Sequence, residues 1–362
     1  MKILFDIGHP AHVHLYKNLI LELKRKGHFI ITTVKDIDLA QKLLSSYGIE
    51  FIRIGHKRDS LISKMFDQLK YNYIVWKLVR KNKIELGIGS SMTLAHVSKI
   101  TKMKSIVFDD DDDEVQELFV KYAHPFCDSL LSPDVLKGKR KLRSTIYYPG
   151  LHELAYLHPK RFMPDPNVLS EANIKEGDVF FILRFNAFKA FHDTDVRGLS
   201  IEQKLEIVEI LKPFGKIFIT TEREIEPELK PYQMKVDPVK IHSLLSYATM
   251  LIGDSQTMTS EAAVLGVPSI RCNSLAENIS YLEELKKKYG LTFSYLPDQF
   301  EQLKLKLKEL LNTDDLKGEW QKKREILLND KMDVTGFMEW FVENYPKSKD
   351  MVKEDQVFRK FK

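Results

Sequence analysis

Short apolar runs alternate with stretches of helical periodicity along almost the whole chain, and this alternation limits the fold more than any other feature. Residues 2–7 are mostly apolar, and residues 13–26 then place leucine and isoleucine at helical spacing before Gly27. The first pattern is typical of a buried strand in a parallel sheet, and the second of a helix that crosses back over the sheet. Because the unit repeats, we predict an α/β protein built on doubly wound parallel sheets.

Residues 149–168 interrupt the alternation with the densest group of prolines in the chain, which is typical of a linker. We therefore predict an N-terminal Rossmann-like domain over 1–160, a C-terminal Rossmann-like domain over 161–345 and a polar, frayed tail over 346–362. The two domains are expected to face a cleft, with ligands at the carboxyl ends of the strands. The expected strands are 2–7, 28–34, 50–54, 86–89, 104–108, 129–131, 179–184, 216–220, 250–253 and 269–272, and the expected helices are 13–26, 37–47, 66–80, 93–100, 201–211, 241–246, 259–265, 300–311, 320–328 and 333–344.

Composition narrows the class of protein. With 362 residues, 43% of them hydrophobic, the chain has enough material for two globular cores, and disordered, collagen-like and coiled-coil classes are excluded. Two cysteines indicate a reducing compartment, and no apolar run reaches the ~18 residues of a membrane span. Asp6 interrupts the first apolar run too early for a signal peptide, so we expect a cytoplasmic protein. The net charge of +5 is mild, and no nucleic-acid partner is expected.

The most informative segment is 251–270, in which a strand, a polar turn, a helix, a Gly-x-Pro stop and another strand follow one another. The turn offers backbone N–H groups at a helix N-terminus together with the hydroxyls of Ser255, Thr257 and Thr259, and this combination suits an anion. Glu261 lies further along the same helix, where its carboxylate could accept hydrogen bonds from a ribose diol. The alternative is that Asp254 and Ser255 only cap the helix and Glu261 only complements its dipole.

The motifs in this segment carry a resemblance to known families. Residues 253–255 (Gly-Asp-Ser), 260–263 (Ser-Glu-Ala-Ala) and 265–268 (Leu-Gly-Val-Pro) resemble the donor-site motif of GT-B glycosyltransferases, and they are also similar to non-hydrolysing UDP-N-acetylglucosamine 2-epimerases. The resemblance implies that the start of the helix binds the donor diphosphate and that its glutamate binds the ribose. Gln256 and Thr257 stand where the epimerases usually have two glycines. The donor-binding residues expected in this segment are Asp254, Ser255, Gln256, Thr257, Met258 and Glu261.

Three further stretches extend the resemblance over nearly the whole chain. They are residues 6–14 (Asp-Ile-Gly-His-Pro-Ala-His-Val-His), residues 148–157 and the group formed by 184–186, 192–193 and 198–200. Together with 241–270 they resemble a family of uncharacterised bacterial and archaeal proteins related to GT-B glycosyltransferases. The resemblance implies a GT-B fold but leaves the reaction open, because one fold supports many functions.

Several polar residues are expected to complete the donor site because they follow strands of the second half. Arg184 would offset the charge of the leaving diphosphate, in the role that metal ions play elsewhere. A surface loop is the alternative for this stretch. The further candidates in the second half are Asn186, Thr221, Glu222 and His242.

The loop after the first strand contains His9, His12 and His14. A histidine here could act as general base on an acceptor hydroxyl, and we predict His9, with Asp6 and His12 as further catalytic candidates. The Gly-His pair at 8–9 is similar to the first loop of the peptidoglycan N-acetylglucosaminyl transferase. A metal site and a purely structural role in packing or capping are the alternatives.

Two charged stretches have competing interpretations. The acidic run 109–114 is predicted to be a solvated loop leading into a helix, although it could bind a divalent cation. Because GT-B chemistry generally needs no bound metal, neither a metal nor another cofactor is expected. Residues 61–83 interleave aromatic and basic side chains, which suits either a core helix with basic flanks or a helix that docks on an anionic membrane.

We therefore predict a glycosyltransferase that uses a nucleotide-diphosphate sugar, with UDP as the expected nucleotide. Its acceptor would be a glycan or a lipid-linked acceptor in cell-envelope or polysaccharide biosynthesis, and the protein could contact the inner membrane face peripherally. The first alternative is a UDP-sugar 2-epimerase, although the first loop lacks the His-x-Gly-Thr-Arg pattern of epimerases. The second is a non-catalytic nucleotide-binding subunit of a glycan assembly pathway.

Overall fold

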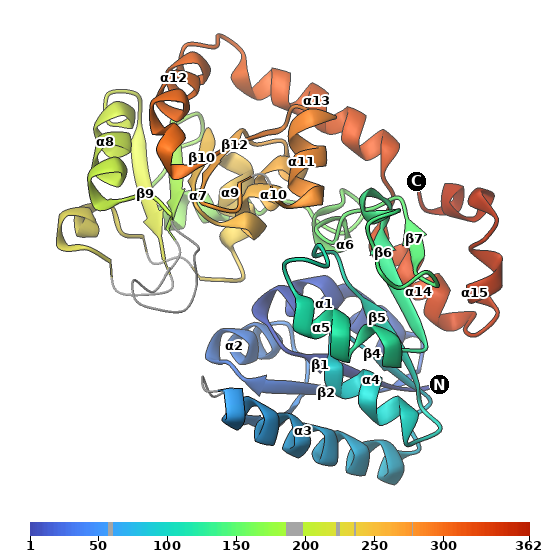
Figure 1. The fold of residues 1–362 in the computed structure, drawn as a ribbon. Coiled ribbons are helices and arrows are strands. Elements are labelled where there is room, and N and C mark those ends of the chain that lie inside the picture. The colour runs from blue at the N-terminus through green and yellow to red at the C-terminus, as the bar shows by residue number, and fades with distance from the viewer. Residues whose placement is uncertain (57–60, 186–197, 222–224, 235–236, 277) are drawn as a thin grey trace. The chain divides into compact units, whose positions relative to one another are not determined.

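The computed structural model of the chain describes residues 1–362 apart from 57–60, 186–197, 222–224, 235–236 and 277 (Figure 1). It contains two compact units, which we call unit 1 and unit 2. Unit 1 consists of Met1–Arg161 and Lys331–Lys362, and unit 2 of Phe162–Asp330. Each unit is built on one parallel β-sheet, so the predicted α/β class is confirmed.

The sheet of unit 1 has the strand order β3-β2-β1-β4-β5-β6-β7, and neighbouring strands pair in parallel. From β1 the chain adds strands toward one edge of the sheet as far as β3, and from β4 it adds them toward the other edge. The boundary between β1 and β4 is therefore a topological switch point, and ligands of open α/β sheets bind at the carboxyl ends of the strands at such a point. The strands are β1 (Lys2–Ile7), β2 (Phe29–Asp36), β3 (Ile52–His56), β4 (Leu86–Ile88), β5 (Lys104–Phe108), β6 (Ser129–Pro133) and β7 (Ile146–Tyr148).

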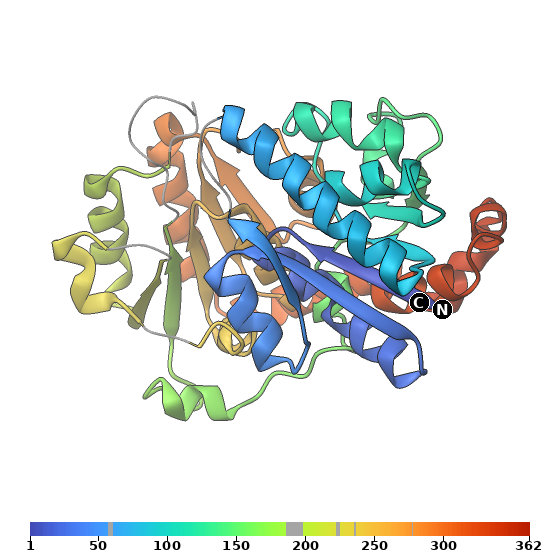
Figure 2. The same ribbon diagram turned by 90° about the horizontal axis from the view of Figure 1, so that it is seen from below.

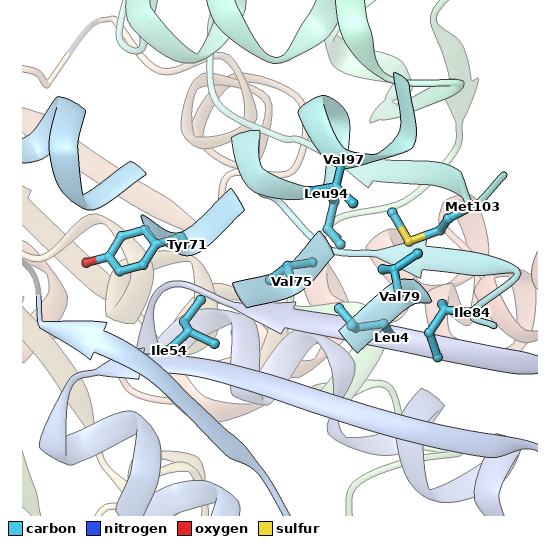
Figure 3. Packing of buried hydrophobic residues seen from close by; sticks show 9 residues of the cluster. All are labelled: Leu4, Ile54, Tyr71, Val75, Val79, Ile84, Leu94, Val97 and Met103. Atoms are coloured by element: carbon cyan, nitrogen blue, oxygen red, sulfur yellow. The ribbon is translucent and has the colours of Figure 1, made fainter. Parts of the chain in front are cut away.

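Helices cover the sheet of unit 1. One part of the core lies between the sheet and the helices α3 and α4, where Val75 and Val79 of α3 meet Leu94 and Val97 of α4 over Leu4 of β1 (Figure 3). Figure 2 views unit 1 from this side, with α3 nearest the viewer. The helices before residue 161 are α1 (Pro10–Arg25), α2 (Asp38–Ser46), α3 (Leu61–Asn82), α4 (Met92–Lys99), α5 (Glu117–Tyr122) and α6 (Leu154–Leu157).

The C-terminal segment also belongs to unit 1. Helix α14 (Val334–Glu343) packs against α1 and α6. Asp333 caps α14 and accepts two hydrogen bonds from Arg161, at 2.9 Å to Nε and 2.6 Å to Nη2. The predicted second domain, 161–345, therefore extends further than unit 2 does. The apolar pattern of 333–344 predicted a helix, but a pattern cannot specify which sheet the helix covers.

The prediction that 346–362 is a frayed polar tail is wrong. The segment forms α15 (Ser348–Met351) and a 3₁₀ helix, Asp355–Phe361. The rings of Phe358 and Phe361 lie 5.5 and 5.7 Å from the ring of Phe337 in α14. The few apolar residues of this polar stretch thus complete an aromatic cluster in unit 1.

The sheet of unit 2 has the order β12-β11-β10-β8-β9, with parallel pairing throughout. Its topological switch point, where the direction in which successive strands are added reverses, lies between β8 and β10. The strands are β8 (Phe180–Arg184), β9 (Lys216–Thr220), β10 (Met250–Gly253), β11 (Ser269–Cys272) and β12 (Thr292–Tyr295), and the helices are α7 (Asn167–Glu171), α8 (Ile201–Leu211), α9 (Ile241–Tyr247), α10 (Gln256–Leu265), α11 (Ser280–Lys287), α12 (Phe300–Leu311) and α13 (Leu316–Asp330). Among the described helices of both units, none is long and apolar enough to cross a membrane.

Candidate functional site

The carboxyl ends of β1 and β4 bring the predicted catalytic residues of unit 1 together with residues that follow β5 and β7. Asp6 lies at the end of β1, and its carboxylate is buried. Its Oδ1 accepts a hydrogen bond from Thr33 Oγ1 at 2.7 Å, and its Oδ2 accepts one from Ser91 Oγ, which also caps α4. Because both oxygens already hold β2 and α4 in place, this arrangement favours a structural role for Asp6.

His9 and His12 lie at the start of α1. His9 is exposed and is the N-cap of the helix, where its Nδ1 accepts a hydrogen bond from Ala11 N at 3.2 Å. Burial, with smaller contributions from the nearby charges of His9 and His152, lowers the pKa of His12 to about 3. Since His12 Nδ1 accepts from Gly8 N at 3.3 Å, the ring proton of the neutral side chain lies on Nε2. His12 can therefore donate a hydrogen bond to a ligand more readily than it can accept a proton.

A histidine–carboxylate pair lies beside these residues. His152 follows β7 and Asp110 follows β5, and the distance from His152 Nδ1 to Asp110 Oδ1 is 3.0 Å. Burial opposes protonation of His152, but the charge and hydrogen bond of Asp110 outweigh it and raise the pKa of the imidazole. Although burial also opposes ionisation of Asp110, His152 holds the pKa of that carboxyl below its usual value. A carboxylate on Nδ1 leaves Nε2 to exchange a proton with a ligand, as in histidine general bases.

Two buried polar atoms, one in this pair and one near it, have no hydrogen-bond partner among the described residues. They are Nε2 of His152 and the phenolic oxygen of Tyr148. Burial raises the pKa of Tyr148 well above its usual value, and the charge of Asp110 contributes. Leaving such an atom unpaired costs about 1–3 kcal/mol, so both atoms are available to hydrogen-bond a polar ligand.

The acidic run after β5 is not the solvated loop predicted from its composition. Asp109, Asp112 and Asp113 are buried, and Arg140 donates to Asp113 Oδ1 at 2.8 Å and to the carbonyl oxygens of Asp109 and Asp111. Three neighbouring carboxylates, those of residues 109–111, are close enough to share a cation. Asp109, however, already accepts from His124 at 2.8 Å and from Gln116, so binding a cation there would break these hydrogen bonds.

Asp111 is expected to make the stability of unit 1 depend on pH. Burial, together with the charges of Asp110 and Asp109, raises its pKa from 3.8 to about 7. Because the folded chain binds this proton more tightly than the unfolded chain, Asp111 lowers the free energy of unfolding as the pH rises from about 4 to 7. Asp111→Asn should therefore stabilise the protein by about 1–2 kcal/mol at pH 8 and by little at pH 4. Urea unfolding at both pH values measures the difference, with Glu114→Gln, an exposed acid in the same run, as control. An equal gain at both pH values would contradict the assignment.

In unit 2, β10 and α10 form the predicted strand–turn–helix unit. Gly253 lies where β10 approaches β8 so closely that a Cβ atom would come within 2.0 Å of the carbonyl oxygen of Arg184. The side chain of Ser255 caps α10 by accepting from Met258 N at 3.3 Å. The helix therefore begins at the carboxyl edge of the sheet, with partly exposed Gln256 and Thr257 in its first turn. Backbone N–H groups in this position suit a phosphate.

The structure also brings Glu261 and His242 together. Both side chains are buried, and Glu261 Oε1 lies 2.9 Å from His242 Nε2. Asp254 is buried as well, and its carbonyl oxygen accepts a hydrogen bond from Asn273 at 2.8 Å. Two residues predicted separately as donor contacts thus form one pair between α9 and α10.

The remaining donor candidates lie at the ends of β8 and β9. Arg184 is the last residue of β8 and lies opposite Gly253 of β10, and its carbonyl oxygen accepts a hydrogen bond from Asp254 N at 3.1 Å. Thr221 directly follows β9. Asn186 and Glu222 lie outside the described residues. Arg184 is therefore the predicted cation that the structure places at the reversal point of the sheet.

The C-terminal end of α10 is expected to be sensitive to substitution. Gly266 ends the helix with φ +73°, and the side chains of Gln321 and Arg324 donate to the last carbonyl oxygens of α10, those of Leu265 and Val264. A Cβ on Gly266 would lie 2.5 Å from Gln321 Nε2. Gly266→Ala should therefore lower the free energy of unfolding by about 2–3 kcal/mol, through backbone strain and displaced hydrogen bonds.

Gly177→Ala is the matched control for this measurement in the same unit. Gly177 has φ +87°, but nothing lies within 4 Å of its Cβ position. It should show the strain alone, about 1 kcal/mol. Equal losses in the two variants, measured by chemical denaturation, would show that the contacts of Gln321 and Arg324 do not matter.

Neither His152 nor Asp110 was predicted to be catalytic. Both lie within stretches that were singled out, Asp110 two residues after β5 and His152 four residues after β7, and the two strands end at the same edge of the sheet. The available signal was therefore position after a strand. It was weak for His152, because the three-residue strand β7 before it was not predicted.

Comparisons with known proteins identify the family and the fold of the chain. A family model described as "Protein of unknown function (DUF354)" matches residues 1–284. An uncharacterised protein of Methanocaldococcus jannaschii, MJ0665, is 23% identical over 282 residues, which cover 74% of this chain and 80% of that protein.

Two solved structures show the fold. The UDP-GlcNAc 2-epimerase of Neisseria meningitidis, solved with bound UDP-GlcNAc, is 12% identical and matches with a TM-score of 0.67 over 95% of this chain and all of its own. The spinosyn forosaminyltransferase SpnP is 14% identical and matches with a TM-score of 0.65 over 98% of this chain and all of its own. At these identities the likeness establishes the fold alone, which is that of GT-B glycosyltransferases and UDP-GlcNAc 2-epimerases, as the sequence motifs predicted.

Proposed function

The chain belongs to the DUF354 family of proteins of unknown function, and we propose that it is a glycosyltransferase that uses a nucleotide-diphosphate sugar. The observation that carries the proposal is the start of α10, a helix N-terminus at the point where the sheet of unit 2 reverses. The dipole of the helix and the backbone N–H groups of its first turn favour binding of a diphosphate there. UDP is the expected nucleotide, since a structural neighbour was solved with UDP-GlcNAc.

Unit 2 would bind the donor. The first turn of α10, with Ser255, Gln256 and Thr257, would receive the diphosphate, and Arg184 would offset the charge that develops on it as the bond to the sugar breaks. Glu261, held by His242, would accept hydrogen bonds from the ribose. We propose that no metal ion is needed, because a cation from the chain supplies the charge.

Unit 1 would supply the base. The pair of His152 and Asp110 is better suited than His9 or Asp6, because its carboxylate orients the ring and stabilises the imidazolium. His152 would take the proton from an acceptor hydroxyl as that oxygen attacks the anomeric carbon, and the nucleoside diphosphate would leave with the bonding electrons. His12, neutral and a donor at Nε2, would hydrogen-bond the acceptor or the sugar.

The acceptor belongs to the proposal as well. We propose a glycan or a lipid-linked acceptor in cell-envelope or polysaccharide biosynthesis, and a cytoplasmic location. The free thiols of Cys127 and Cys272 support a reducing compartment.

Calorimetric titration of the whole protein with UDP, GDP, CDP and ADP tests the proposal. One nucleotide should bind more tightly than the others, and its sugar derivatives should release the nucleoside diphosphate when extracts containing acceptors are added. Failure of all four to bind would overturn the donor assignment.

A UDP-sugar 2-epimerase is the second candidate, and Asp111 is the observation that favours it. With a pKa raised to about 7 by burial and its acidic neighbours, Asp111 provides a second group that can exchange protons beside Asp110. Conversion of a UDP-sugar to its epimer without any acceptor would establish this reaction in place of transfer.

A further inference from the structure

Helix α3 presents two opposite faces. Its inner face, with Tyr71, Val75 and Val79, packs in the core (Figure 3). At about 100° per residue, the opposite side chains lie within an arc of roughly 120°. This set, which we call the outer face of α3, consists of Phe66, Leu69, Lys70, Tyr73, Lys77 and Arg80, and the half-buried Trp76, which also packs against the core, lies at its edge.

The outer face exposes large apolar side chains in a single line. The exposed fractions are 67% for Phe66, 64% for Leu69 and 54% for Tyr73. Tyr73 stacks on Trp76 with 6.0 Å between ring centres, and the ammonium of Lys77 lies 4.5 Å from the ring of Tyr73. Apolar residues scattered singly on a surface need no explanation, but a contiguous line of them does.

The charges on this face have one sign. Lys70, Lys77 and Arg80 are all exposed, whereas Asp67, the one acidic residue in the sequence of α3, is buried. Lys81 and Lys83 continue the positive charge at the end of the helix. The face therefore complements an anionic surface.

Hydrogen bonds hold the outer face in a fixed orientation on unit 1. Gln68 donates to Thr93 Oγ1 of α4 at 2.9 Å, and Asn72 Nδ2 lies 3.2 Å from His96 Nδ1 of the same helix. Figure 2 shows α3 from its outer side, running the length of unit 1. The helix that carries these aromatic and basic side chains is thus fixed on unit 1 before any partner binds.

We propose that the outer face of α3 docks unit 1 on an anionic lipid bilayer. Tyrosine and tryptophan favour the depth of the lipid headgroups, where Phe66 and Leu69 would reach the acyl boundary, and the cations would meet the anionic headgroups. A second copy of the chain is a poorer partner, because a two-fold contact would bring the same cations against each other. The proposal does not depend on the reaction that the protein catalyses.

Sedimentation with vesicles tests the proposal on the whole protein. The chain should bind vesicles of phosphatidylcholine with 30% phosphatidylglycerol at low salt, bind pure phosphatidylcholine much more weakly, and dissociate as salt rises. Replacing Lys70 and Lys77 by glutamate should weaken vesicle binding more than tenfold, since each cation near an anionic surface raises the affinity about fivefold. The Phe66→Ser, Tyr73→Ser double variant should weaken it about tenfold.

Helix α12 provides the matched control. Leu305, which is 70% exposed, and Lys308 lie on its surface in unit 2, and Leu305→Ser with Lys308→Glu should leave vesicle binding unchanged. Brominated lipid should also quench the fluorescence of Trp76, and Trp76→Phe should abolish that quenching, because Trp320 is buried and Trp340 lies on α14, which packs against α1 and α6. Equal binding to both kinds of vesicle, or equal loss in the α12 variant, would overturn the proposal. So would a dimer that Tyr73→Ser dissociates, because the face would then join two copies of the chain.

Discussion

Replacing His152 by asparagine is expected to lower the turnover of the nucleotide sugar by about 10²–10⁴-fold and to leave its dissociation constant unchanged. The amide is close in size but cannot take up the proton that His152 Nε2 would accept. Because the donor would bind to unit 2, the loss should appear in kcat alone. Release of nucleoside diphosphate, followed by chromatography, measures the rate, and calorimetry measures the affinity.

Two further variants separate catalysis from folding. His158→Asn removes another buried imidazole of unit 1, whose ring accepts from Lys160 N at 3.2 Å, and it should retain turnover. Asp110→Asn removes the charge that raises the pKa of His152, so the acidic limb of the pH–rate profile should move to lower pH. Wild-type turnover in His152→Asn would exclude His152 as the base and return that role to His9.

Much of the fold was predictable because it depends on local patterns. Apolar runs gave the buried strands β1 and β10, and glycines after periodic stretches marked the ends of α1 and α10. The same reasoning missed the short strands β7 and β12, which span three and four residues. The equally short β4 and β10 were found because all their residues are buried, whereas β7 (Ile-Tyr-Tyr) and β12 (Thr-Phe-Ser-Tyr) are half-buried edge strands without the aliphatic run typical of a buried strand.

The donor half of the candidate site was predictable for the same reason, since its residues are neighbours in sequence around Ser255. The unit 1 half was not, because its pairs join distant residues. Asp110 meets His152 across 42 positions, and Asp109 meets Arg140 across 31. The composition of an acidic run indicates solvent exposure, and only the tertiary contacts of Arg140 and His124 explain its burial.

Glu261→Ala is expected to weaken binding of the preferred nucleotide by about 100-fold. Two hydrogen bonds from a ribose diol to a buried carboxylate contribute about 1.5 kcal/mol each, and a tenfold change corresponds to about 1.4 kcal/mol. Glu261→Gln keeps one oxygen acceptor and should lose about tenfold. Titration calorimetry measures each constant, and Glu228→Ala, an exposed acid of unit 2, should bind as the wild type does.

The loss in Glu261→Ala has a structural explanation that must be separated from ribose binding, because Glu261 also holds His242 at 2.9 Å. A nucleotide that lacks both ribose hydroxyls makes the separation. If Glu261 binds the diol, this analogue should bind the wild type and Glu261→Ala equally weakly, since each change removes the same interaction. If the variant weakens the analogue by the same 100-fold, the carboxylate acts by positioning α9 against α10, and the ribose assignment is wrong.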